Sequence, residues 1–169
     1  MFTLVIGGAA SGKSEYAEAR ALSLPGQRVY LATMRPSDGE CLARIEKHRL
    51  RRVGRDFETV EQYIDLASAP IPAGANILLE CMGNLLANEL YEPHGGGSDA
   101  VLHGINTLLS RCRNLTVVTN EVCSGGADYD ESTLFYLREL ARVNRALAAQ
   151  ADSVVEVVCG LPHFWKGAP

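Results

Sequence analysis

Short apolar runs alternate with amphipathic segments along this chain, and the alternation predicts its fold class. Five runs are almost continuously apolar, as is typical of strands covered on both faces: Thr3–Ile6, Arg28–Ala32, Ile77–Glu80, Thr116–Thr119 and Val154–Val158. Helical periodicity is found at Lys13–Leu24, Gly39–Arg52, Val60–Ala67, Asn84–Tyr91, Asp99–Arg113 and Glu131–Ala151. Repeated strand–helix–strand order predicts an α/β fold, with a mostly parallel sheet, right-handed crossovers and flanking helices.

The segments between these elements predict loops and not domain boundaries. Residues 94–98 contain three consecutive glycines between two predicted helices, and residues 123–130 follow the end of a predicted strand. We find no internal repeat, so we expect a single domain over residues 1–169. The last residues read as a packed or frayed tail, although His163 and Trp165 could instead cover a pocket.

Composition and charge exclude several classes of protein. The 169 residues are 47% hydrophobic and 21% charged, which excludes a disordered chain. No apolar run approaches the roughly 20 residues that a membrane-spanning helix needs. The formal net charge of -4 argues against nucleic acid as a partner. Five cysteines without C-x-x-C spacing argue against a disulfide framework and a zinc site. Without a visible signal peptide, we expect a cytoplasmic protein.

The strongest chemical signal is a glycine-rich turn between the first predicted strand and the first predicted helix. Gly7-Gly8-Ala9-Ala10-Ser11-Gly12-Lys13-Ser14 matches G-x-x-x-x-G-K-[ST] in full. Glycines let backbone N–H groups surround a phosphate, and the helix N-terminus adds positive dipole character. Lys13 is expected to reach the β- and γ-phosphates, and the Ser14 hydroxyl to bind Mg²⁺. We interpret the turn as the phosphate-binding loop of a P-loop NTPase (RecA-like) fold.

A magnesium site of this kind usually recruits a carboxylate at the end of a neighbouring strand. Glu80 and Glu121 both follow predicted strands, where ligands bind in open α/β sheets. We favour Glu80 for the metal or nucleotide because its strand is more purely apolar. Glu121 remains the alternative, and either residue could simply mark a strand end.

The one strongly basic stretch of this acidic protein is a predicted helix around a histidine. Arg44, His48 and Arg52 are spaced at i, i+4 and i+8, so they share one helix face. Such an imidazole could attack an α-phosphate and form a covalent phosphoramidate. The residues alone favour the plainer interpretation, which is a solvated basic face with an incidental histidine.

Further motifs follow the phosphate-binding loop in a specific order: Val29–Thr33, Ala43–His48 followed by Arg52, Thr59–Glu61, Leu78–Cys81, Val118–Val122, Val143–Asn144 and Gly160–Pro162. In this order the sequence resembles the bifunctional adenosylcobinamide kinase / adenosylcobinamide-phosphate guanylyltransferase family (CobU/CobP type). The resemblance runs nearly from end to end. Its most specific parts are R-I-x-x-H, L-L-[DE]-C and V-T-N-E-V.

The resemblance implies two reactions and most of the site. A nucleoside triphosphate (ATP or GTP) phosphorylates the aminopropanol hydroxyl of adenosylcobinamide, and GTP then guanylylates that phosphate through a GMP–histidine intermediate. The matching nucleophile is His48, and the implied oligomer is a homotrimer. The implied nucleotide contacts are the phosphate-binding loop from Gly7, Gly8, Ala9, Ala10, Ser11 and Gly12 to Lys13 and Ser14, together with Ala32, Thr33, Met34, Arg49, Leu50, Arg51, Arg52, Glu61 and Glu80.

The chain departs from the family pattern in several places, and one of them is a loop that is expected to touch the substrate or a neighbouring subunit. The family's G-x-G-I-V-P loop here reads Ser124–Tyr129, and its L-T after L-L-[DE]-C reads Met82-Gly83. Two alternatives to the bifunctional enzyme stay open. One is a P-loop kinase with a single activity on another small alcohol. The other is a non-enzymatic nucleotide-sensing or nucleic-acid-binding module that uses the basic stretch.

Overall fold

Seven strands form one sheet, in a computed structural model that describes residues 1–37, 39–122 and 128–168, without the side chains of Glu40, Arg44, Lys47 and Arg51. The sheet order is β3-β2-β4-β5-β1-β6-β7. The strands are β1 (Phe2–Gly7), β2 (Arg28–Ala32), β3 (Glu58–Glu61), β4 (Asn76–Glu80), β5 (Asn114–Asn120), β6 (Ser153–Val158) and β7 (Leu161–Lys166). All neighbouring pairs are parallel except β6 with β7. The predicted α/β fold with a mostly parallel sheet is confirmed.

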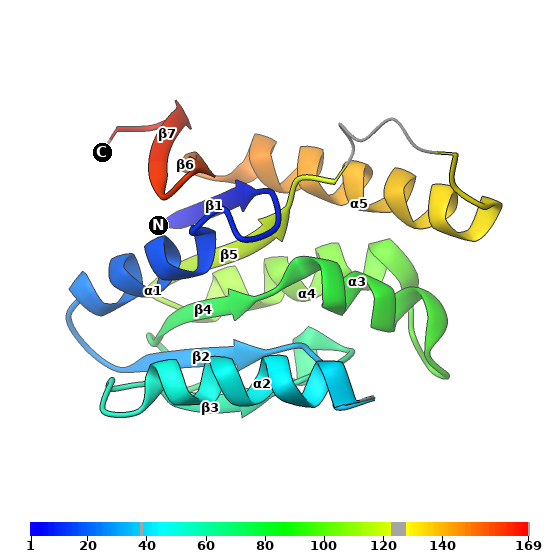
Figure 1. Ribbon diagram of the computed structural model, residues 1–169. Coiled ribbons are helices and arrows are strands. Elements are labelled where there is room, and N and C mark those ends of the chain that lie inside the picture. Colours follow the sequence, from blue (N-terminus) through cyan, green and yellow to red (C-terminus); the bar gives the residue numbers. More distant parts are fainter. Residues whose placement is uncertain (38, 123–127, 169) are drawn as a thin grey trace.

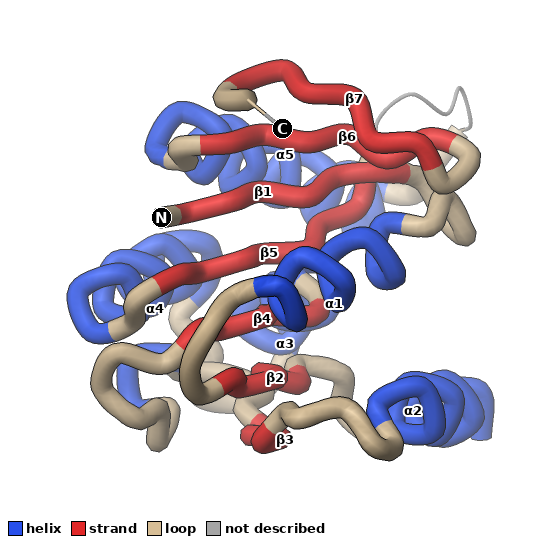
Figure 2. The backbone as a smooth tube through the Cα atoms, turned by 90° about the vertical axis from the view of Figure 1, so that its left-hand side faces the viewer, coloured by secondary structure: helices blue, strands red, loops and turns tan. Residues whose placement is uncertain are grey.

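Helices cover both faces of this sheet (Figure 1). They are α1 (Lys13–Ser23), α2 (Gly39–Arg52), α3 (Met82–Tyr91), α4 (Gly97–Arg111) and α5 (Glu131–Gln150), with a 3₁₀ turn at Leu66–Ser68. Helices α3, α4 and α5 pack on one face, whereas α1 packs on the other. Helix α2 lies on the side of α1, and Figure 2 shows it standing away from the sheet beyond β2 and β3. No helix within the described ranges has the length and apolarity to cross a bilayer.

The continuous apolar runs split between two cores, because successive strand side chains point to opposite faces. Val29 and Leu31 belong to the larger core under α3, α4 and α5, whereas Tyr30 between them faces α1. On β4, Leu79 and Leu78 divide in the same way. The central strands are therefore buried on both faces, as their composition predicted, and polar groups are left to gather where the strands end.

Two sequence predictions about elements are wrong. The predicted helix Val60–Ala67 is instead the end of β3 and the 3₁₀ turn, because Val60 pairs in parallel register with Leu31 at the sheet edge. This edge strand has only one buried residue, so it lacks the apolar run that identified the others. The expected tail is strand β7, antiparallel to β6 and mostly exposed.

Candidate active site

The phosphate-binding loop connects β1, an interior strand of the sheet, to α1. Gly12 has φ 93°, a left-handed conformation that favours glycine, and a side chain there would come within 3.0 Å of Gly160 Cα. At Gly7, an added Cβ would lie 2.7 Å from the carbonyl oxygen of Val157. The Gly160 N–H donates to the Ser11 carbonyl at 2.8 Å. The turn between β6 and β7 thus packs against the loop and supports its shape.

A cavity of about 600 Å³ opens above this loop. Within the loop, the Lys13 Nζ donates to the Gly8 carbonyl at 2.9 Å. The Ser14 hydroxyl donates to Glu80, which ends β4 and is 8% exposed. The structure therefore brings together Lys13, Ser14 and Glu80, the residues that the sequence assigned to triphosphate and metal. A hydroxyl and a carboxylate at one point are the oxygen donors that Mg²⁺ prefers.

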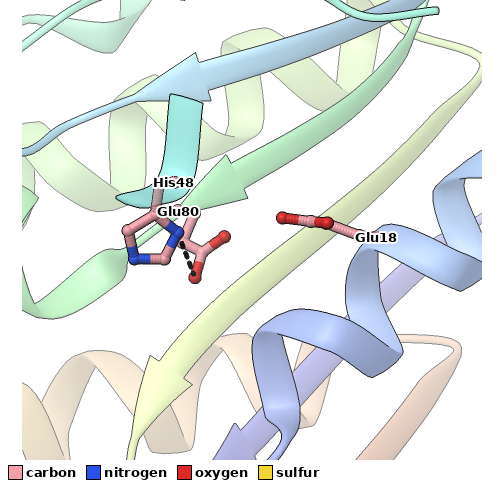
Figure 3. Close-up of side chains that lie close together, drawn as sticks. All are labelled: Glu18, His48 and Glu80. Atoms are coloured by element: carbon pink, nitrogen blue, oxygen red, sulfur yellow. Dashed lines mark ion pairs between the residues drawn. The ribbon is translucent and has the colours of Figure 1, made fainter. Parts of the chain in front are cut away.

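Helix α2 presents its histidine to the same cavity. Ile45, His48 and Arg52 line it from one face of the helix, at spacings of i, i+3 and i+7. His48 is 23% exposed, and its Nδ1 lies 4.0 Å from Glu80 Oε1. Figure 3 shows the imidazole edge turned towards this carboxylate. The imidazole ring and the phosphate-binding loop thus line opposite sides of one cavity. His48 is not part of a solvated helix face.

Arg52 and Tyr30 form the inner end of this wall. The Arg52 guanidinium carbon lies 3.5 Å from the Tyr30 ring centroid, a cation–π contact. Arg52 is 8% exposed, and its Nη1 has no hydrogen-bond partner among the described residues. The Tyr30 hydroxyl donates to Glu80 Oε2 at 3.2 Å. Burial and the nearby Glu80 carboxylate raise the pKa of Tyr30 far above its usual value, so Tyr30 remains a neutral donor.

Not every residue implied by the resemblance lines this cavity. Ala32 and Met34 do, but Thr33 is fully buried, and its hydroxyl donates to the Cys81 carbonyl at 2.8 Å. Arg49 and Leu50 are exposed on α2 and are absent from the lining. Glu61 lines a second cavity of about 450 Å³, with Arg35, Tyr63, Glu92 and His94 among its neighbours.

Some predictions fall outside what the structure describes or outside this cavity. The side chains of Arg44 and Arg51 and most of the Ser124–Tyr129 loop, residues 124–127, lie outside the described residues. Of the two candidate carboxylates, Glu80 lines the cavity, whereas Asn120 and Val122 line it on either side of Glu121. On β7, the ring centroids of His163 and Trp165 lie 4.6 Å apart, and neither residue lines this cavity.

Two polar residues that the sequence did not single out lie at this cavity or next to it. Glu18 on α1 is 1% exposed, and its carboxylate pairs with Arg55. Its signal was its spacing: Ser14, Ala17, Glu18 and Ala21 share a helix face by their i, i+3, i+4 and i+7 positions, and three of them are buried. Asn84 also lines the cavity, and its Nδ2 has no hydrogen-bond partner within the described part of the chain.

Two further groups determine the electrostatics around the cavity. Burial raises the pKa of the Cys81 thiol, which lines the cavity next to Glu80, so it stays protonated at neutral pH. The ligand atoms of Glu18, His48 and Glu80 all lie within 4.8 Å of one another (Figure 3). Of this trio, Glu18 is already paired with Arg55, whereas Glu80 accepts the hydrogen bond from Ser14.

Comparison with known proteins agrees with this geometry. A family model described as cobinamide kinase / cobinamide phosphate guanyltransferase (CobU) matches residues 3–164. The bifunctional adenosylcobalamin biosynthesis protein CobU of Escherichia coli (strain K12) is 38% identical over 181 residues, which cover 95% of this chain and 97% of that protein. The bifunctional adenosylcobalamin biosynthesis protein CobP of Pseudomonas aeruginosa is 33% identical over 100% of this chain and 99% of that protein.

A third relative agrees with these matches, whereas the structural neighbour adds nothing to them. The CobU protein of Salmonella typhimurium, with the same description, is 35% identical over 95% of this chain and 97% of that protein. Among solved structures, the P4 protein from bacteriophage phi6 in complex with ADP gives a TM-score of 0.43 at 11% identity, over 96% of this chain and 53% of that one. This last likeness is too low for any inference. The sequence matches suffice: the chain belongs to the cobinamide kinase / cobinamide phosphate guanyltransferase family.

Proposed function

We propose that this protein is a bifunctional enzyme of cobalamin biosynthesis, which phosphorylates adenosylcobinamide and then transfers GMP from GTP to the resulting phosphate. The observation that carries the proposal is one cavity in which a phosphate-binding loop and the half-buried His48 face each other. A kinase needs only the loop. An imidazole opposite a bound triphosphate is the additional group that nucleotidyl transfer through a covalent intermediate needs.

In the kinase reaction, the acceptor hydroxyl attacks the γ-phosphorus of ATP or GTP, and the nucleoside diphosphate leaves. Backbone N–H groups of the loop and the N-terminus of α1 hold the phosphates. Lys13 stabilises the negative charge that develops during transfer. Mg²⁺ bound at Ser14 and Glu80 would supply further charge neutralisation on the phosphate oxygens. The hydrogen bond from Tyr30 keeps the Glu80 carboxylate oriented towards Ser14.

In the transferase reaction, His48 attacks the α-phosphorus of GTP, so that an N–P bond forms and pyrophosphate leaves. The phosphate oxygen of adenosylcobinamide phosphate then attacks the same phosphorus, and the N–P bond breaks. Nδ1 lies 4.0 Å from Glu80 Oε1, and the negative charge there favours the tautomer with its proton on Nδ1. We propose that Nε2, which has the lone pair in that tautomer, is the nucleophile. The buried Arg52, whose Nη1 has no protein partner among the described residues, is placed to bind the triphosphate.

The enzyme's remaining nucleotide contacts, oligomeric state, compartment and acceptor can also be proposed. The remaining contacts named by the resemblance, among them Arg49, Leu50, Arg51 and Glu61, would bind GTP when it occupies the site for guanylyl transfer. We further infer a homotrimer in the cytoplasm, which light scattering of the purified protein and fractionation of cells would test. The corrinoid acceptor would be tested by product analysis with adenosylcobinamide.

The decisive experiment incubates the protein with GTP labelled at the α-phosphate and isolates the denatured protein. We expect acid-labile, hydroxylamine-sensitive label that disappears in His48→Ala. His103→Ala is the matched control because His103 is exposed on α4, on the opposite face of the sheet. An unlabelled wild-type protein that still transfers γ-phosphate to an alcohol would overturn the transferase half and leave a kinase with one activity.

A further inference from the structure

A buried carboxylate with no part in the chemistry above lies close to His48 and Glu80, which line the cavity. Glu18 of α1 is 1% exposed, and a buried carboxylate destabilises the fold unless a partner compensates its charge. Its partner is Arg55, whose Nη1 donates to Glu18 Oε2. Arg55 follows α2 by only three residues. The ion pair therefore joins the first helix of the fold to the end of the helix that carries His48.

The C-terminal end of α2 is held by two arginines from one turn. Arg52 stacks on the Tyr30 ring of β2, and the Arg55 N–H donates to the Arg52 carbonyl at 3.0 Å. The two side chains thus attach the same turn to β2 and to α1. Elsewhere along α2, large residues such as Leu42 and Leu50 are exposed, and the helix stands apart from the sheet (Figure 2). Its position depends strongly on these charged contacts.

The same carboxylate also flanks the reactive ring. The Glu18 side chain extends from α1 towards His48 and Glu80, whose ligand atoms lie within 4.8 Å of it (Figure 3). His48 lies one helical turn before Arg52, the last residue of α2, and Arg55 follows three residues later. A shift of this end of the helix therefore moves the imidazole directly. A displacement of about 1 Å between reacting groups can cost about 10²-fold in rate.

We propose that Glu18 is a positioning residue for guanylyl transfer: through its ion pair with Arg55 it fixes the end of α2 so that His48 faces the phosphate-binding loop. The inference rests on the proposed function for its catalytic consequence, but not for the placement of α2. The kinase reaction does not use His48. Loss of the ion pair should therefore affect the two reactions unequally, which a general loss of stability would not do.

The test compares Glu18→Gln, Arg55→Gln and the double variant with wild type. The matched control is Asp56→Asn, which removes the exposed ion pair of the next residue, Asp56 with Arg28. We expect these variants to fold, because Phe57 still packs edge-on against Tyr30 beyond the turn. In single-turnover experiments, Glu18→Gln and Arg55→Gln should slow covalent labelling by α-labelled GTP about tenfold or more. Transfer of γ-phosphate should change less than about twofold.

Two further comparisons make the result specific to the pair. The double variant should label no more slowly than the slower single variant, since each change removes the same interaction. Arg55→Lys should recover part of the rate because it keeps the positive charge. Labelling at the wild-type rate in Glu18→Gln, or equal losses in both reactions, would overturn the proposal.

Amide hydrogen exchange of the segment 39–52 separates this inference from the proposed function. Exchange should rise about tenfold or more in Glu18→Gln and Arg55→Gln, and stay unchanged in Asp56→Asn. If wild-type protein takes no label from GTP, the proposed transferase fails, and exchange alone then decides whether Glu18 holds α2. Unchanged exchange in both variants would overturn the positioning role whatever the labelling shows.

Discussion

The two walls of the cavity are built by different physical means. The phosphate-binding loop is formed by backbone between the interior strand β1 and α1, and main-chain atoms of Gly160 and Val157 support it. The opposite wall is α2, which stands away from the sheet and is attached at its end by the side chains of Arg52 and Arg55. One wall depends on chain conformation, and the other on a few charged contacts.

The two walls should differ in how well they tolerate amino-acid substitutions. A loop that binds phosphate through N–H groups keeps its chemistry when side chains around it change, provided that its glycines and Lys13 remain. A helix held by charged side chains can be displaced by single substitutions without damage to the core. Reactions that need only the loop should therefore survive changes in α2, whereas reactions that need both walls should fail with either.

The largest expected effect comes from the loop, because both reactions bind a triphosphate there. Lys13→Ala should lower γ-phosphate transfer and covalent labelling by GTP by about 10²–10³-fold each, since a charged donor to the transition state is lost. The measurement is single-turnover transfer with γ- and α-labelled nucleotide. Lys166→Ala on the exposed strand β7 is the control. Kinase activity that survives in Lys13→Ala would mean that the loop does not hold the transferred phosphate.

A smaller and selective effect is expected from Arg52 on the other wall. Arg52→Ala removes the cation–π contact with Tyr30 and the buried guanidinium that faces the cavity. Covalent labelling should fall about 10²-fold, since a charge-assisted contact to the triphosphate and the placement of α2 are lost together. Transfer of γ-phosphate should fall much less. Arg145→Ala, exposed on α5, is the control; equal losses in both reactions would contradict the division between the walls.

The same contrast explains how much could be predicted from the sequence. The loop from Gly7 to Ser14, its strand and its helix are consecutive in the chain, so a local pattern identified all of them. Glu80 was favoured because it ends a buried strand, and the structure places it in contact with Ser14. Short-range pattern and the rule that parallel strands end at one edge were sufficient here.

The placement of His48 and the role of Glu18 depend on contacts between distant segments. Glu18 and Arg55 are separated by 37 positions, and no local pattern pairs them. From the residues alone His48 looked like part of a solvated face, and only the family resemblance pointed to its role. Strand β3 was missed for a similar reason, because Val60 is ordered by its pairing with Leu31 and not by an apolar run.

A third prediction tests the claim that the loop wall depends on backbone conformation. Gly12→Ala places a Cβ at φ 93° and 3.0 Å from Gly160 Cα, which should cost about 1–2 kcal/mol. Thermal unfolding should shift down by about 3–6 °C. Gly8→Ala is the control for stability, because a Cβ there meets nothing within 4 Å. Equal melting temperatures for the two variants would show that the loop is less constrained than its geometry indicates.

The last expected effect appears only at alkaline pH and concerns Tyr30, which connects the walls through Glu80 and Arg52. Its pKa is raised above the usual value, chiefly by burial and then by Glu80. A raised pKa favours the neutral form in the folded protein. The stabilisation is therefore complete below pH 10, the pKa in the unfolded chain, and is lost as the pH rises above it. The loss should reach about 1.4 kcal/mol at pH 11.

Tyr30→Phe removes this pH dependence and keeps the ring on which Arg52 stacks. The free energy of unfolding in urea should fall less between pH 9 and pH 11 in Tyr30→Phe than in wild type, by that same amount. Tyr129→Phe at the exposed Tyr129 should behave like wild type. If the free energy of unfolding of Tyr30→Phe fell with pH as steeply as that of wild type, the hydroxyl would not be buried against Glu80. The two walls would then meet only through the ring of Tyr30, and the alignment of Glu80 would depend on Ser14 alone.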